Sequence, residues 1–376
     1  MRFLTADYLY TLVNEPIKNG VLQVDDSGKV INTYSNFLDV PSNKIDCYQG
    51  ILCPGFINAH CHLELSHLQG SRDQVKGFLD FLSIIKDRDN FSKHKIISAI
   101  EESEKQMIKN GIVGVGDICN TLDTLPQKLT GKMQYYNFIE VFEVDANKSA
   151  EAISSALVIR DKFRSNDLQA TISPHAPYSV PPSLMKAISD VSDNLDFVFS
   201  IHNQETKHED ILFEHKEGEF YKWLCFLNAS SEIWKKRSSS ADIIQELNTE
   251  KNILFVHNTY SEKLDSIDQY YCTCPNANLF IEQKLPDYSI FNSDYLCVGT
   301  DGLASNNSLS IINELAQIQK HSDYSLEVLL KIACRNGAIA LGFNDLGTFE
   351  IGKRPGINLI SNYSLGLESA SVTKII

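Results

Sequence analysis

No stretch of this sequence approaches the roughly 20 consecutive apolar residues that a transmembrane helix needs. We therefore expect no membrane span. The first 20 residues also lack the apolar segment of a secretory signal, because charged side chains recur there at Arg2, Asp7, Glu15 and Lys18. These absences predict a cytoplasmic protein.

Clustered cysteines are missing as well. The nine cysteines are an odd number, scattered from Cys47 to Cys334. Disulfide frameworks belong to short secreted chains, so this usage indicates free thiols in a reducing compartment. Cys272 and Cys274 share one face of an expected strand, but structural zinc needs a second such pair, which this chain lacks. We expect these two cysteines in the core or in a pocket wall.

Positively charged side chains are fewer than negatively charged ones. The chain has 34 lysines and arginines against 48 aspartates and glutamates, which gives a net charge of −14. Such a surface repels phosphate backbones, and no basic stripe offsets it. Lys235, Lys236 and Arg237 form a short basic patch, which we expect to be a solvated helix face. The composition therefore favours a small-molecule substrate and disfavours a nucleic-acid partner.

What the sequence does contain is a regular alternation of short apolar runs with longer, charged, helix-like stretches. The apolar runs are Ile51–Asn58, Ile112–Ile118, Tyr135–Phe142, Leu168–Ser173, Phe197–Ile201, Ile253–Val256, Tyr270–Thr273 and Tyr295–Val298. Buried strands that alternate with helices indicate a parallel sheet. Eight β/α units predict an α/β fold of the (β/α)8 TIM-barrel type. A doubly wound sheet is the alternative, but its glycine-rich phosphate fingerprint after the first strand is missing.

The residues on either side of this alternation have β character. The strand-like pieces are Val21–Val24, Val30–Thr33, Phe37–Val40, Gly347–Ile351 and Ile357–Ile360. We expect residues 1–50 and 347–376 to join as one small β-sandwich domain, and residues 51–346 to form the barrel.

Histidines gather at the expected strand ends. The first strand ends in His60-Cys61-His62, and alternation turns His60 and His62 to one side. Alone, this pair is a weak signal for a metal, and two partly exposed loop histidines are the more common explanation. The other polar residues at strand ends are His175, His202, Glu205, His257 and Asp301. Five of the 10 histidines thus fall where barrel enzymes place their active sites, which indicates a metal centre.

These segments resemble a known family. The run Pro54–His62 is similar to the opening motif of the amidohydrolase superfamily. The runs Ser173–Ser179, His202–Glu205 and Gly299–Asn306 resemble its deaminase/chlorohydrolase branch, which includes cytosine, guanine, S-adenosylhomocysteine and aminodeoxyfutalosine deaminases. The resemblance covers nearly the whole chain, with the motifs in the right order.

The resemblance implies a role for each residue. The metal ligands that it implies are His60, His62, His202 and Asp301. It makes Glu205 the general acid/base, His257 the residue that polarises the electrophile or steadies the attacking water, and His175 a contact of the substrate ring. Binuclear relatives carry a carboxylated lysine on the fourth strand, but residues 168–175 contain no lysine, which favours one metal ion. Many relatives have threonine where this chain has Cys61, whose side chain should point away from the ion.

Three imidazoles and one carboxylate suit zinc, and also ferrous iron. A bound metal makes hydroxide available near neutral pH, Asp301 can orient it, and Glu205 can carry protons to the ring and to the leaving amine. We expect a hydrolytic deaminase of an aminated heterocycle or nucleoside. The alternatives are hydrolysis of another C–N or C–Cl bond, as in a cyclic amidase or chlorohydrolase, and a non-catalytic binding homologue.

Substrate choice should depend on the loops. The long segments Leu63–Asn90 and Thr206–Asn248 are candidate lids, and the second fits an extra pair of helices packing its own aromatics equally well. Homodimers are common in the family that the chain resembles, so a homodimer is a further expectation.

Overall fold

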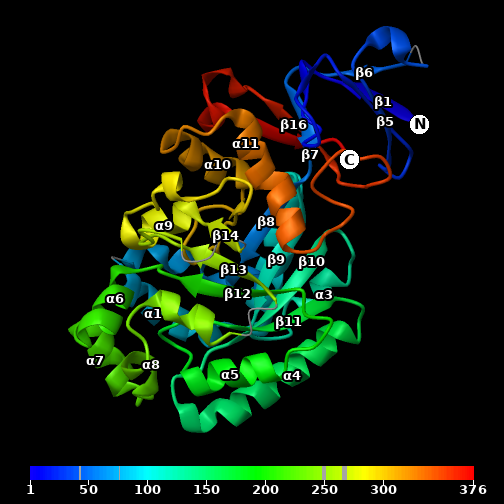
Figure 1. The fold of residues 1–376 in the computed structure, drawn as a ribbon. Coiled ribbons are helices and arrows are strands. Elements are labelled where there is room, and N and C mark those ends of the chain that lie inside the picture. The colour runs from blue at the N-terminus through cyan, green and yellow to red at the C-terminus, as the bar shows by residue number, and fades with distance from the viewer. Residues whose placement is uncertain (42–43, 76, 248–250, 265–268) are drawn as a thin grey trace.

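The computed structural model covers residues 1–376 and describes all of them except 42–43, 76, 248–250 and 265–268. Its centre is built from eight parallel strands (Figure 1). Their bounds are β8 Phe56–Cys61, β9 Ile112–Cys119, β10 Gln134–Val141, β11 Gln169–Pro174, β12 Val198–Asn203, β13 Asn252–His257, β14 Tyr270–Thr273 and β15 Leu296–Val298. Each of the eight expected strands is present.

These strands close into a barrel. They form two four-stranded parallel sheets, in the orders β8-β9-β10-β11 and β12-β13-β14-β15. Backbone hydrogen bonds bridge the two seams between the sheets. At one seam the Thr300 N–H donates to the His60 carbonyl at 3.1 Å, and at the other the His202 N–H donates to the His175 carbonyl at 2.9 Å. The expected (β/α)8 architecture is confirmed.

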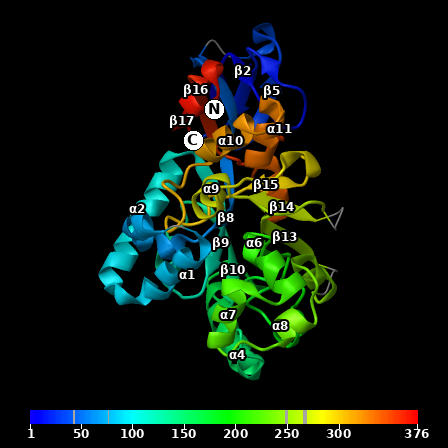
Figure 2. The same ribbon diagram turned by 90° about the vertical axis from the view of Figure 1, so that its left-hand side faces the viewer.

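Helices cover the outside of the barrel (Figures 1 and 2). The longer ones are α1 Phe78–Lys86, α2 Lys93–Lys109, α4 Ser149–Arg164, α5 Pro182–Asp190, α7 Gly218–Phe226, α9 Pro275–Glu282 and α10 Ile311–Lys320. The shorter ones are α3 Leu125–Lys128, α6 Lys207–Asp210, α8 Glu232–Lys235, α11 Leu326–Leu330 and α12 Gly337–Ala340. In α2 the buried residues Ile96, Ile100 and Met107 recur at helical spacing, and the Ser92 side chain caps its first turn.

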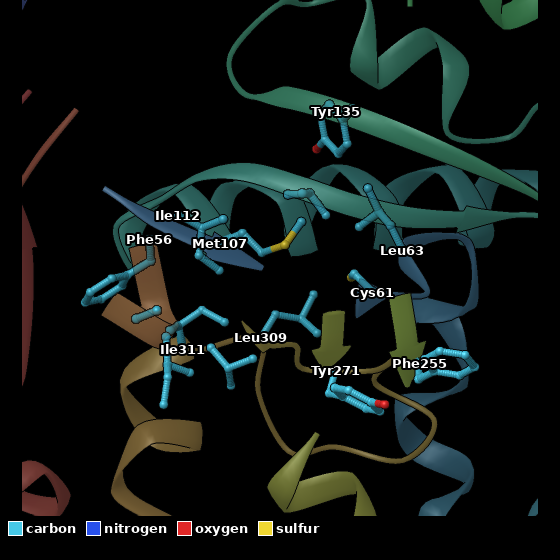
Figure 3. Close-up of a cluster of buried hydrophobic side chains, with 14 of the residues drawn as sticks. Phe56, Cys61, Leu63, Met107, Ile112, Tyr135, Phe255, Tyr271, Leu309 and Ile311 are labelled. Carbon is cyan, nitrogen blue, oxygen red and sulfur yellow. The ribbon is translucent and has the colours of Figure 1, made fainter. Parts of the chain in front are cut away.

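Alternate residues of each strand pack into two separate cores. Figure 3 shows part of one of them, which includes Cys61, Leu63, Phe255 and Tyr271. The second core lies inside the barrel and contains, among others, Tyr136, Phe138, Val198, Leu254, Cys272, Cys274 and Cys297. Cys272 and Cys274 are therefore core residues, as expected, and Cys61 faces away from the metal-site residues.

The two ends of the chain build two further sheets. The four-stranded sheet runs β5-β4-β1-β6, and the five-stranded sheet runs β17-β16-β7-β2-β3. Their bounds are β1 Arg2–Thr5, β2 Tyr8–Leu9, β3 Ile17–Lys18, β4 Val21–Val24, β5 Val30–Tyr34, β6 Asp46–Cys47, β7 Ile51–Pro54, β16 Ile357–Ser361 and β17 Ser371–Lys374. A shared core with Leu4, Leu22, Leu52 and Ile357 joins the sheets. Figure 2 shows both chain ends in this part, which is a small β-sandwich.

Three local expectations were wrong. Phe37–Val40 is not a strand, because the Asn36 side chain accepts from the Leu38 N–H and caps a 3₁₀ turn, Phe37–Asp39. Gly347–Ile351 forms no strand, since Gly347 takes a φ of 87° and Phe349 donates its N–H to Thr11. The run Ile51–Asn58 divides between two sheets: β7 belongs to the sandwich and β8 to the barrel. The domain boundaries at residues 50/51 and 346/347 stay a prediction.

Arg237 also differs from expectation. Instead of facing solvent, its side chain is buried, pairs with Glu246 at 2.5 Å and donates to the carbonyls of Pro177 and Val180. It thus braces the segment that follows β11. None of the helices in the described part of the chain has the length and apolar composition of a bilayer crossing.

Candidate active site

The predicted metal ligands converge on one point at the carboxyl ends of the barrel strands. The Asp301 Oδ1 atom lies 3.5 Å from His60 Nε2 and 3.3 Å from His62 Nε2. His62 Nε2 lies 3.2 Å from His202 Nε2. His60, His202, His257 and Asp301 offer ligand atoms that are all within 4.8 Å of one another. The structure therefore brings together all four residues expected to hold the metal, with His257 beside them.

The hydrogen bonds of these histidines fit a metal ion. His202 Nδ1 donates to the His175 carbonyl at 2.9 Å, so its Nε2 carries a lone pair that faces the cluster. Among the described residues, neither ring nitrogen of the buried His60 has a hydrogen-bond partner, and nor does His257 Nε2. Buried polar atoms without partners are costly, and a cation at this point would satisfy them.

Burial also sets the charges that a cation would meet. It lowers the pKa values of His60, His62, His202 and His257, to about 3 for His62, so these imidazoles are neutral at pH 7. Burial alone would raise the pKa of Asp301, but the adjacent imidazole of His60, and then those of His62 and His257, hold it below its usual range. Neutral imidazoles around an ionised carboxylate form the donor set that zinc prefers.

Local backbone geometry aims two of these side chains. His257 and Asp301 have φ values of 73° and 55°, in the left-handed region that non-glycine residues rarely adopt. His257 is then fixed by a 2.7 Å hydrogen bond between its Nδ1 and Asn278 Oδ1, and the Ser305 hydroxyl donates to Asp301 Oδ2. Both strand ends are bent toward the site rather than continuing along the barrel.

Glu205 lies beside this cluster as a buried carboxyl group. Its Oε1 is 3.7 Å from His257 Nε2, and its side chain is hydrogen-bonded to Tyr178. Burial, and then the charge of Asp301, raise its pKa well above the usual value. Glu209 fixes the turn by accepting the Glu205 N–H at 2.8 Å. The raised pKa favours the protonated form of the carboxyl, which is the form that general acid catalysis requires.

His175 lies in the wall of the cavity, between the rings of Phe142 and Tyr178. Its Nδ1 contacts the Ser179 hydroxyl at 2.6 Å, and burial lowers its pKa to about 3. It is placed where a bound ring could meet it, but its predicted role as a substrate contact stays a prediction.

A cavity of about 600 Å³ opens above these residues. Its floor includes His62, His202, Glu205, His257 and Asp301, and its walls are largely apolar. Phe78 from the segment after β8 packs edge-on against Tyr178 and Phe220, and Trp223 of α7 stacks on Phe220. The two candidate lids therefore pack on each other beside the cavity, although residues 76 and 248 within them lie outside the described part. The volume suits a ligand of nucleoside size.

Sequence reasoning missed two polar residues of this cavity, Asn120 and Glu140. Asn120 directly follows β9, and Glu140 is the second-last residue of β10. The rule that selected the histidines, a polar residue at a predicted strand end, applies to both. Neither strand ends in a histidine, so the signal there is weaker than at His60 or His202.

The amidohydrolase family model matches residues 51–376. The chain belongs to the amidohydrolase family. The resemblance drawn from Pro54–His62 is thereby confirmed.

Relatives of this amidohydrolase include several deaminases. It is 26% identical to an aminodeoxyfutalosine deaminase from Nitratiruptor, over 92% of this chain and 87% of the relative. It is 28% identical to an adenosine deaminase from Helicobacter pylori, over 82% and 78% of the two chains. The crystal structure of Helicobacter pylori aminofutalosine deaminase with methylthio-coformycin superimposes with a TM-score of 0.81, at 24% identity, over 96% of this chain and 92% of the other. This last likeness supports the fold.

Proposed function

We propose that this amidohydrolase is a metal-dependent hydrolase that removes the amino group of an adenosine-like nucleoside. The observation that carries the proposal is the position of the Glu205 carboxyl, 3.7 Å from His257 and beside the converging side chains of His60, His62, His202 and Asp301 at the cavity. Relatives named as deaminases of adenosine and aminodeoxyfutalosine support the substrate class.

We further propose that His60, His62, His202 and Asp301 hold a single divalent ion, with zinc as our first choice and ferrous iron as the alternative. The unpartnered nitrogens of His60 and the facing Nε2 atoms of His62 and His202 support this set. When bound, the ion would supply a water-derived nucleophile at neutral pH.

The remaining residues would manage the protons. Glu205 protonates the ring nitrogen next to the carbon under attack, which draws electrons away from that carbon. It then takes up the proton that the attacking water gives off, passes it to the departing amine and recovers a proton from the protonated product. Water and substrate thus become the hydroxylated ring and ammonia, and the acid is restored. His257, held by Asn278, steadies the water, and Asp301 orients it. We propose that His175 contacts the ring.

Ammonia release from a panel of compounds tests the proposal. Zinc-loaded protein should release ammonia from at least one nucleoside among adenosine and 5′-deoxyadenosine. Guanine, cytosine, a chloro-triazine and a hydantoin complete the panel, and turnover confined to the last two would favour the chlorohydrolase or cyclic-amidase alternative. Absence of all turnover would favour the binding homologue.

A first prediction concerns Glu205→Gln, which keeps the shape of the side chain but removes its acid. We expect this variant to lose about 10²- to 10⁴-fold in kcat, because an amide can neither give up nor take up the protons that the reaction moves. Elemental analysis should find as much zinc as in the parent protein. Retained activity would remove Glu205 from the mechanism, and lost zinc would make it a ligand.

A cytoplasmic location and a homodimer stay predictions.

A further inference from the structure

Glu140 has a carboxylate oxygen that the proposed chemistry does not use. Along β10, Tyr136 and Phe138 point into the barrel core, and Glu140 continues this row to the cavity. Its side chain is only 8% exposed. Oε2 accepts a hydrogen bond from Asn120 Nδ2 at 3.1 Å, whereas Oε1 has no hydrogen-bond partner among the described residues.

The hydrogen bonds of the neighbouring residues determine which oxygen of Glu140 remains without a partner. Glu64 accepts the backbone N–H groups of Asn120 and Thr121 at 3.1 Å, which anchors the turn after β9. The Asn120 Oδ1 atom accepts from Arg88 at 3.2 Å, so its amide nitrogen must face Glu140. These bonds hold the Glu140 side chain, which lines the cavity, with Oε2 satisfied and Oε1 buried without a hydrogen-bond partner among the described residues.

A role in orienting His202 does not account for the unpartnered Oε1 atom of Glu140. Oε1 lies 3.7 Å from His202 Nδ1, which is too long for a hydrogen bond. The Nδ1 proton is already donated to the His175 carbonyl at 2.9 Å. The carboxylate therefore needs a donor that comes from outside the chain.

We propose that Glu140 Oε1 accepts a hydrogen bond from a sugar hydroxyl of the nucleoside, which makes Glu140 and its neighbours a sugar subsite. This inference rests on the proposed function. A hydroxyl fits better than an ammonium group, because the Arg88 guanidinium is part of the same network and would repel a second cation. A hydroxyl can also accept a hydrogen bond, which suits a subsite where carboxylate and guanidinium lie close together.

The test compares ribonucleosides with their deoxy analogues. For the nucleoside that the wild type deaminates fastest, kcat/KM should exceed that of its 2′-deoxy or its 3′-deoxy analogue by tenfold or more, because a buried acceptor built for a hydroxyl rejects a ligand that lacks it. Equal values for all three would overturn the inference without any variant.

The variant Glu140→Gln provides the second part of the test. The glutamine oxygen should face Asn120, which needs an acceptor, so that the amide N–H groups face the cavity. We expect this variant to lose tenfold or more in kcat/KM for the ribonucleoside, and much less for the deoxy analogue. Glu143→Gln is the matched control, because Glu143 accepts the Asp145 N–H just beyond the same strand and does not line the cavity.

The outcomes separate this inference from the proposed function. If no nucleoside releases ammonia with zinc-loaded wild type, the proposed function fails and the sugar subsite with it. If the wild type is active but Glu140→Gln slows ribo and deoxy substrates equally, only the subsite is wrong. Lower zinc content in Glu140→Gln would assign Glu140 to the support of His202 instead, which also overturns the subsite.

Discussion

At the scale of single residues, Lys128 and Asp117 form an ion pair that is closed off from solvent. Lys128 Nζ lies 2.5 Å from Asp117 Oδ2 and donates to Asn137 Oδ1 at 2.7 Å. The other oxygen of Asp117 accepts the Leu63 N–H at 2.9 Å, directly after His62. The pair therefore ties β9 to the segment that carries a proposed metal ligand.

Removing one partner of this pair should be costly. Lys128→Met leaves the Asp117 carboxylate buried without its cation, and we expect a loss of about 3–5 kcal/mol in the free energy of unfolding. Urea denaturation measures the loss. The control is Lys186→Met, which breaks the exposed Lys186–Asp190 pair and should cost less than about 1 kcal/mol. Equal losses in both variants would mean that burial of the first pair has no energetic consequence.

Individual site residues were predictable where their type is scarce. Histidine is rare enough that its recurrence at strand ends, as at His60 and His202, stands out in the sequence. A single glutamate such as Glu140 does not, because acidic residues occur throughout this chain. The burial of Arg237 depends on its contacts with Glu246 and with two carbonyls of a distant turn, which no local pattern reports.

At the scale of elements, the seam between β15 and β8 leaves no room for side chains. A Cβ atom on Gly299 would lie 2.7 Å from the His60 carbonyl oxygen and 2.8 Å from the His60 Cβ. Since the clash is with backbone, β8 itself would have to move. The position of His60 thus depends on a glycine that directly follows the neighbouring strand β15.

Gly299→Ala should therefore weaken metal binding as well as stability. We expect zinc affinity to fall about tenfold or more, because His60 is displaced, and the free energy of unfolding to fall by about 1–3 kcal/mol, as for an overpacked core. Competition with a chromophoric chelator and urea titration measure the two effects. Gly70→Ala is the control, since no atom lies within 4 Å of the added methyl group. Unchanged zinc affinity in Gly299→Ala would show that the seam tolerates the displacement.

The barrel strands were predictable as elements because each is a short apolar run between charged helices. The division of Ile51–Asn58 into β7 and β8 has only one local signal, the dipeptide Pro54-Gly55, which is typical of turns but does not say that the two halves join different sheets. Its two halves differ only in their partners, β16 for one and β9 for the other. Such long-range pairing leaves no mark on the local sequence.

At the scale of the whole molecule, buried carboxyls should make the metal-free protein less stable as pH rises above 6.5. Burial raises the pKa to about 7 for Glu64, Glu140 and Glu314, and to about 8 for Glu209. Between pH 6.5 and 8 the folded state therefore keeps protons that the unfolded state has released, so stability falls as pH rises. The site histidines, whose pKa values are lowered, are neutral in both states over most of this window.

Urea denaturation of chelator-treated protein from pH 6.5 to 8 tests this prediction. Each retained proton contributes up to about 1.4 kcal/mol per pH unit to the slope. Glu140→Gln removes one of the four groups and should give a shallower decline. A free energy of unfolding that stays level or rises over this range would contradict the prediction.

The pairing of β7 with β16 also bears on how the protein is made. Ile51 in β7 is hydrogen-bonded in register with Ile360 in β16, so at about 5–20 residues per second a ribosome needs roughly 15–60 s to deliver the second strand after the first. The barrel strands, by contrast, emerge in the order in which they pair. We expect the edge of β7 that pairs with β16 to stay unpaired in the nascent chain throughout that interval. The five-stranded sheet, whose strands come from both ends of the chain, should therefore form last.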